Sequence, residues 1–172
     1  PRRACYRLLI VMRTYRLSMA ILLLLVSAAK AAETLPPRVS FLVSVKNPTR
    51  DVSAGDLRRI FLGEISRWSN GHHIVLFVRP AETPEGHIFL DRLIRMSDID
   101  YSQWWLGAVF RGRAAAAPRV VKSSEAMEKA VAANPDAIGF LLMTPAAVEP
   151  SVVVLTIDRK PPADLEYPVR ER

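Results

Sequence analysis

The sequence predicts an α/β fold, in which helices flank a mainly parallel sheet and form one layered domain. Runs of β-branched and aromatic residues alternate along the chain with segments whose apolar residues recur at helical spacing. About 140 residues follow an N-terminal segment typical of an export signal, enough for one compact core but not for two ordinary lobes. The single cysteine, Cys5, lies in that N-terminal segment, so we expect no disulfide in the domain.

The chain divides into three expected parts: an N-terminal extension with a secretory signal peptide (1–32), the domain (38–158) and an irregular C-terminal tail (159–172). Arg13 and Arg16 form the charged start of the signal, 17–26 its apolar core, and 29–31 an A-x-A cleavage site. The apolar run is about a dozen residues, shorter than the roughly 20 that cross a bilayer. An uncleaved membrane anchor is the alternative. We expect a periplasmic protein that begins near Ala32.

The basic character of the chain comes from this N-terminal segment. The sequence has 24 Lys and Arg against 17 Asp and Glu, a net charge of +7. Six of the basic residues and none of the acidic ones precede Glu33, which leaves 18 against 17 and a net charge of +1. The domain therefore lacks the positive charge that binding to nucleic acid requires, and we expect no nucleic-acid partner.

The first half of the domain reads as strand, helix and strand. Apolar residues with period two predict a largely buried strand over 39–45, which Asn47-Pro48 ends. Ser53 is placed as a helix N-cap with Asp56 three residues later, and Gly63 as the end of that helix. Ser69-Asn70-Gly71 predicts a turn before a second buried strand over 73–78.

The second half continues the alternation. Thr83-Pro84 predicts a helix with a hydroxyl N-cap and proline in its first position, and Ser97-Asp98 starts a helix that runs to about Phe110. A short strand is expected at 119–121, a helix from Ser123 or Ser124 through Val131, a strand at 137–142 and a last strand at 152–157. Three prolines make the tail irregular.

No catalytic motif or metal-ligand set is visible after the signal. His72 and His73 are adjacent and point to opposite faces of a strand, while His87 lies on a helix, so we expect no metal site and no cofactor. Asp98 and Asp100 are explained by capping of a helix start. With no nucleophile, base and orienting group together, we expect no enzyme activity.

The strongest candidate binding site is Arg79 followed by the helix start at Thr83, with Glu85 and Gly86 in its first turn. Unpaired N–H groups at a helix start and a bidentate arginine can hold an oxyanion. Glu82 and Glu85 oppose this, because their charges occupy the position of the anion and pair with Arg79 or the helix end instead. Both alternatives remain open on the residues alone.

Trp68 offers a second candidate surface, for a partner or as part of a cleft. It lies in the segment 63–71, which is otherwise interpreted as a turn that connects two strands. Trp104 and Trp105 lie in the predicted helix from Ser97 to Phe110, and aromatic residues of a helix are more often packed than exposed for stacking. Core packing is therefore the favoured interpretation for the three tryptophans.

Several segments in order resemble one family: DLRRIFLGEISRW, IVLFVRP, WWLGAVFRGRAAAAPRVV and VAANPDAIGFL. Over 39–143 the chain resembles the periplasmic phosphate-binding proteins of ABC transporters, in the PBP-like superfamily, and in particular their short single-lobe relatives. The resemblance implies one lobe of a type II periplasmic-binding-protein fold. It also implies that Arg79 and Thr83 match the arginine and serine that contact phosphate, while Pro84 and Glu85 replace a glycine and a threonine.

Two functions follow from this resemblance. The first is an exported substrate-binding protein, similar to those of phosphate transporters, that binds phosphate or another small oxyanion without catalysis. One lobe offers half a pocket, open to water and salt, so a homodimer or another envelope protein such as an ABC transporter would close it. The alternative is an envelope interaction or regulatory module that keeps the fold without high-affinity ligand binding. It would present the former cleft to a partner, with Glu82 and Trp68 as the candidate surface residues beside Arg79 and Glu85.

Overall fold

The computed structural model describes residues 38–142, 149–164 and 166–169. The predicted signal peptide, its cleavage site and Cys5 lie outside these residues. Among the helices of the described part, none has both the length and the apolar character needed to cross a membrane.

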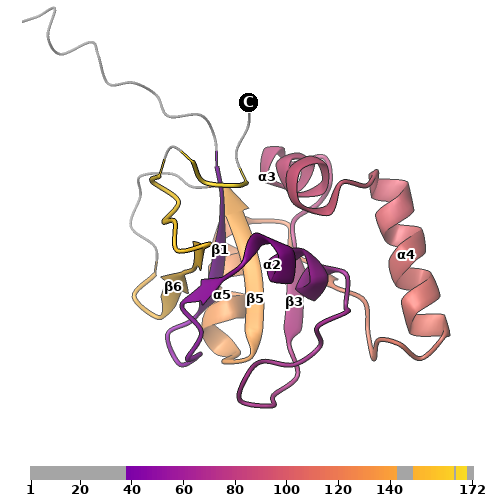
Figure 1. Cartoon of the computed structure of the whole chain (residues 1–172), viewed down its shortest axis with the longest axis horizontal. Coiled ribbons are helices and arrows are strands. Elements are labelled where there is room, and N and C mark those ends of the chain that lie inside the picture. The colour runs from indigo at the N-terminus through magenta and orange to yellow at the C-terminus, as the bar shows by residue number, and fades with distance from the viewer. Residues whose placement is uncertain (1–37, 143–148, 165, 170–172) are drawn as a thin grey trace, which may run out of the picture. The chain divides into compact units, whose positions relative to one another are not determined.

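A five-stranded sheet forms the centre of the domain (Figure 1). Its strand order is β4 (Arg119–Val120), β3 (Val75–Val78), β5 (Ala137–Leu142), β1 (Val39–Ser44) and β6 (Val152–Val154). A small second sheet pairs β2 (Asp51–Val52) with β7 (Thr156–Ile157). Three of the five pairings are parallel, and the two that β1 makes, with β5 and β6, are antiparallel. The predicted α/β fold with a mainly parallel sheet is confirmed.

Helices cover both faces of the sheet. They are α2 (Ala54–Phe61), α3 (Pro84–Ile88), the π-helix η1 (Phe89–Ile94), α4 (Asp98–Phe110) and α5 (Ser124–Ala133). In Figure 1, α2 crosses in front of the sheet and α5 lies behind it, while α4 stands at the right-hand edge.

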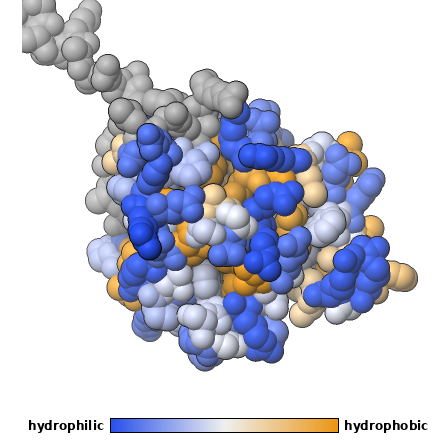
Figure 2. Space-filling model, in the orientation of Figure 1, coloured by the Kyte–Doolittle hydropathy of each residue, from blue (hydrophilic) through white to orange (hydrophobic). Residues whose placement is uncertain are grey.

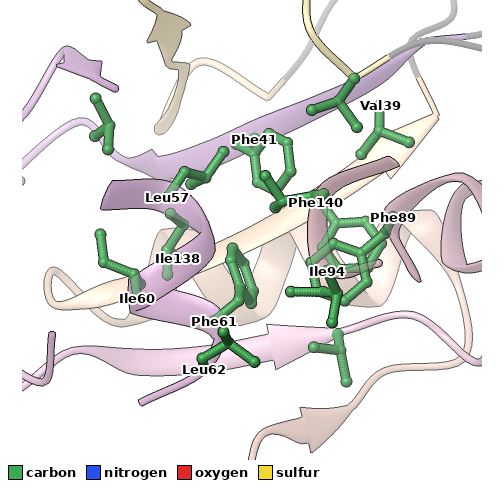
Figure 3. Packing of buried hydrophobic residues seen from close by; sticks show 14 of the residues in the cluster. Val39, Phe41, Leu57, Ile60, Phe61, Leu62, Phe89, Ile94, Ile138 and Phe140 are labelled. Atoms are coloured by element: carbon green, nitrogen blue, oxygen red, sulfur yellow. The ribbon is translucent and has the colours of Figure 1, made fainter. Parts of the chain in front are cut away.

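The main core lies between the sheet and the helices α2 and η1 (Figure 3). Four phenylalanines meet there: the rings of Phe89 and Phe140 stack with centroids 4.3 Å apart, and Phe61 packs edge-on against both. Phe41 lies 5.7 Å from Phe61. A smaller cluster on the other face joins Leu42 and neighbouring residues to α5. Since β1 contributes to both clusters, it is buried on both faces, as its apolar sequence predicts.

Most predicted elements are found, with changes at their ends. The strand β3 begins at Val75 rather than His73, and α5 ends at Ala133 rather than Val131. The strand predicted over 152–157 is divided into β6 and β7. At Thr156 the chain leaves β1 and pairs with β2 instead, and the Thr156 N–H donates to the Arg50 carbonyl at 3.0 Å. The sequence pattern predicted neither β2 nor the π-helix.

Residues 158–164 and 166–169, the described part after β7, form no helix or further strand, yet they pack on the domain. Tyr167 and Val169 are each 1% exposed. The Val39 N–H donates to the Val169 carbonyl at 3.1 Å, and the buried Arg38 guanidinium donates to the carbonyls of Pro162 and Asp164. These contacts make the segment part of the same core rather than an extension from it.

Candidate functional site

A hollow of about 340 Å³ lies at the carboxyl end of β3, beside its parallel neighbour β4. Ligands of α/β proteins bind at this end of a sheet. Its walls come from the end of β3, from one side of α4 and from the segment before and within β4, and include Val78, Arg79, Tyr101, Trp105, Leu106 and Val120. The lining is largely apolar, and Arg79 is its one basic residue.

Arg79 is held by an ion pair within the protein. Its Nε donates to Glu85 Oε1 at 2.6 Å, and its Nη1 donates to the Val121 carbonyl at 2.8 Å. The side chains of Arg79 and Glu85 are only 7% and 6% exposed. Breaking such a buried pair leaves a charge without a partner, which is costly. The charge of Arg79 is therefore already neutralised by the carboxylate that the sequence placed beside it.

The helix start next to Arg79 is also internally satisfied. Thr83 is the N-cap of α3, with Pro84 in the first position, as predicted. Its hydroxyl accepts from the Gly86 N–H at 3.1 Å and donates to the Pro80 carbonyl at 2.7 Å. A side chain on Gly86 would bring its Cβ within 2.0 Å of the Pro80 oxygen. Thr83 and Gly86 therefore serve a tight turn into α3 and leave no free donor pair for an anion.

The two glutamates of the predicted site play different parts. Glu85 is buried and neutralises Arg79, whereas Glu82 is exposed and has no ion pair among the described residues. Of the two alternatives that the sequence left open, the geometry favours the internal pair over an anion between Arg79 and the helix start.

Trp68 is buried, in agreement with the core packing that the sequence favours and not with the alternative of a partner or cleft surface. It is 6% exposed and belongs to the main core, and its indole N–H donates to the Asp136 carbonyl at 2.9 Å. Because a buried indole N–H needs an acceptor, this bond fixes the ring inside the fold. Trp105 packs similarly, at 4% exposed with its N–H toward the Phe61 carbonyl. Packing is confirmed as the role of both residues.

The other polar residues on the wall of the hollow are Tyr101, Ser102 and Asp98. Burial raises the pKa of the Tyr101 hydroxyl above its usual value, partly offset by the hydrogen bond with Trp105. The hydroxyl therefore stays protonated and donates to the Phe61 carbonyl at 2.8 Å. Ser102 and Asp98 lie on the same wall. Within the described residues, no three His, Cys, Asp or Glu side chains come together as metal ligands.

The outer face of α4 is a feature that the search for sites in the sequence missed. Ile99, Leu106 and Phe110 are 69%, 73% and 90% exposed, on the side opposite the buried Tyr101 and Trp105. In Figure 2, hydrophobic residues interrupt the hydrophilic surface at the right-hand edge, where Figure 1 places α4. The signal was present in the sequence, because the helix has apolar residues on all sides.

The chain has no match among protein-family models or curated proteins. Its fold is similar to that of several solved structures. An ABC-type phosphate transport receptor from Vibrio cholerae has a TM-score of 0.58 at 21% identity, over 76% of this chain and 50% of that one. PstS from Borrelia burgdorferi has a TM-score of 0.63 at 17% identity, over 79% and 55%.

A third similar structure, from Clostridium perfringens, is described as a phosphate ABC transporter substrate-binding protein with bound phosphate. Its TM-score is 0.58 at 15% identity, over 73% of this chain and 47% of that one. The chain thus spans about half the length of the solved structures that it matches. These similarities establish the fold, and the predicted likeness to part of the phosphate-binding proteins is confirmed at that level.

Proposed function

We propose that this chain is an exported, non-catalytic module that keeps the fold of phosphate-binding proteins but acts by contact with another protein rather than by tight capture of free phosphate. The observation that carries the proposal is the buried ion pair of Arg79 and Glu85, 2.6 Å apart. The arginine that would bind the anion already has a carboxylate partner.

The energetic argument compares phosphate with Glu85 as partners of Arg79. To use the Nε side of the guanidinium, phosphate must displace a carboxylate that is 6% exposed and leave it unpaired. Loss of a buried partner costs about 3–5 kcal/mol, which weakens affinity by roughly 150- to 4,000-fold. The hollow is also open on one side, so water competes and salt screens any anion there. Tight binding of free phosphate is therefore unfavourable.

Oxyanion binding remains a second candidate function, because one observation favours it. Arg79 lies on the wall of the hollow, and its Nη2 makes no hydrogen bond with any described residue. One of the structurally similar proteins holds phosphate. A phosphate or another small oxyanion in the hollow would then contact Nη2 alone, and we expect weak binding that needs a partner, such as an ABC transporter, to close the site.

Isothermal titration of the purified protein with sodium phosphate, at low and at physiological salt, separates the two functions. The interaction function predicts no heat of binding at phosphate concentrations below about 1 mM, because any affinity would be weaker than that. Micromolar binding that is lost in Arg79→Ala would instead establish the oxyanion function.

Glu85→Gln is the informative variant, because it keeps the size of the side chain and removes the competing charge. If Glu85 is what prevents binding, this variant gains measurable phosphate binding that the unchanged protein lacks. Circular dichroism of each variant checks that the fold is retained, and Glu82→Gln is the matched control on an exposed glutamate. Equal affinity in the unchanged protein and Glu85→Gln would contradict the part assigned to the ion pair.

A further inference from the structure

Helix α4 has apolar residues on opposite sides. Tyr101, Trp105 and Ala108 are buried against the domain, while Ile99, Leu106 and Phe110 are between 69% and 90% exposed. A surface helix of a globular protein normally has one apolar and one polar face, and a helix that is apolar all round is buried in its working state. The outer face of α4 therefore has the composition of an interface.

The exposed residues follow the spacing of a helix-pairing seam. Ile99, Gln103, Leu106 and Phe110 are separated by four, three and four residues, which places them in one stripe along α4. Apolar residues at this alternation of three and four are what one helix presents to another in two-helix packing. Gln103 is the one polar member, near the middle of the stripe. The stripe therefore fits another helix along most of its length.

The charges at the two ends of α4 have opposite signs. Asp98 and Asp100 lie in the first turn, and Arg111 and Arg113 directly follow the last. All four are exposed, and none forms an ion pair with another described residue. An antiparallel copy of the same helix brings the acidic start of one against the basic end of the other, twice by symmetry. A parallel copy would place like charges together.

On this basis we propose that the partner of this interaction module is a second copy of the same chain, docked through an antiparallel, two-fold pairing of the α4 outer faces. The inference rests on the proposed function and names its partner. In the register that it predicts, Ile99 of one copy faces Phe110 of the other and Gln103 faces Leu106. Asp100 and Arg111 lie on the same flank of the stripe, and a two-fold antiparallel pairing brings that flank of each copy together. Asp100 of one copy therefore comes near Arg111 of the other.

Pairing through α4 also bears on the hollow. Leu106 belongs to the proposed interface and to the wall of the hollow, and Asp98 and Ser102 line the hollow as well. The second copy therefore borders the opening beside Arg79. Dimerisation would narrow the access of water to a site that a single lobe leaves half open.

Sedimentation equilibrium of the purified protein over a range of concentrations tests the pairing. We expect a reversible dimer, with association at least about tenfold weaker in Phe110→Asp and in Leu106→Asp. Val45→Asp is the matched control, because Val45 is an exposed valine elsewhere, 47% accessible, and should leave association unchanged. A protein that stays monomeric at the highest concentration, or a dimer unaffected by Phe110→Asp, would overturn the inference.

Exchange of the terminal charges tests the antiparallel register. Asp100→Lys and Arg111→Glu should each weaken the dimer, since each places like charges near one another, and the double variant should restore it. Raised salt should weaken the unchanged dimer. A dimer that the double variant fails to restore would exclude this register. The phosphate titration tests the proposed function separately. A monomeric protein that does not bind phosphate would contradict the pairing but leave the interaction function standing. A dimer that binds phosphate tightly would support the pairing but contradict the interaction function.

Discussion

Helices α2 and α4 are built by the same local rules but present different surfaces. Each begins at a serine N-cap, Ser53 or Ser97, whose hydroxyl accepts from the N–H of an aspartate three residues later. Each is followed by a glycine with positive φ, 72° at Gly63 and 67° at Gly112. Local sequence therefore defines the two helices equally well.

The difference lies on the side that faces away from the domain. In α2 that side carries Asp56 and Arg59, which pair at 3.2 Å, whereas in α4 it carries Ile99, Leu106 and Phe110. The polar outer side of α2 is well solvated by water. The apolar outer side of α4 is exposed to water at a cost in free energy, which burial against a partner would remove. The comparison indicates that α2 serves the fold alone and that α4 serves both the fold and an interface.

The largest expected difference in the free energy of unfolding is between substitutions of one phenylalanine in each helix. Phe61 of α2 is fully buried among Phe41, Phe89 and Phe140, so Phe61→Ala should lower the free energy of unfolding by about 3–5 kcal/mol. Phe110 of α4 is 90% exposed, and Phe110→Ala should change it by less than about 0.5 kcal/mol at concentrations where the protein is monomeric. Urea unfolding measures both. Similar losses in the two variants would mean that Phe110 packs within its own chain, and the comparison would fail.

A smaller difference is expected at the glycines that follow the two helices. Both have positive φ, so Gly→Ala costs about 1–2 kcal/mol at either position from backbone strain. A Cβ on Gly63 would also lie 2.7 Å from the Trp105 ring, while one on Gly112 meets nothing within 4 Å. Gly63→Ala should therefore lower the free energy of unfolding by about 1–3 kcal/mol more than Gly112→Ala does, which is the usual cost of overpacking. Thermal unfolding of the pair measures the difference, and equal costs would show that Trp105 can move aside.

Sequence reasoning predicted the elements that depend on local signals. The N-caps at Ser53, Thr83 and Ser97 were predicted correctly, because a hydroxyl just before an apolar run at helical spacing can accept a hydrogen bond from a backbone N–H of the first turn. The π-helix was missed, since its sequence has ordinary helical spacing. The antiparallel pairing of β1 with β5 was missed as well, because it is decided between segments about 100 residues apart, which no periodicity reports.

The candidate site was predicted only as a set of neighbours in sequence. Arg79, Glu85 and the cap at Thr83 were placed together, and the structure keeps them together. Whether Arg79 binds an anion or Glu85 depends on the 7% and 6% exposure of their side chains, which is a property of the packed fold. For Trp68 the sequence favoured packing but left a partner surface open for the same reason, since its acceptor is the carbonyl of Asp136, far along the chain.

The smallest expected change in the free energy of unfolding comes from the N-caps, and it tests whether the first turn of α4 is as stable as that of α2. Ser53→Ala and Ser97→Ala each remove one capping acceptor, so each should lower the free energy of unfolding by about 1 kcal/mol. Ser→Asn at either position keeps the acceptor and serves as the control. Urea unfolding monitored by circular dichroism measures all four variants. If Ser97→Ala costs nothing while Ser53→Ala costs the full amount, the first turn of α4 frays in the folded chain, and its apolar stripe would gain a fixed register only on contact with a partner.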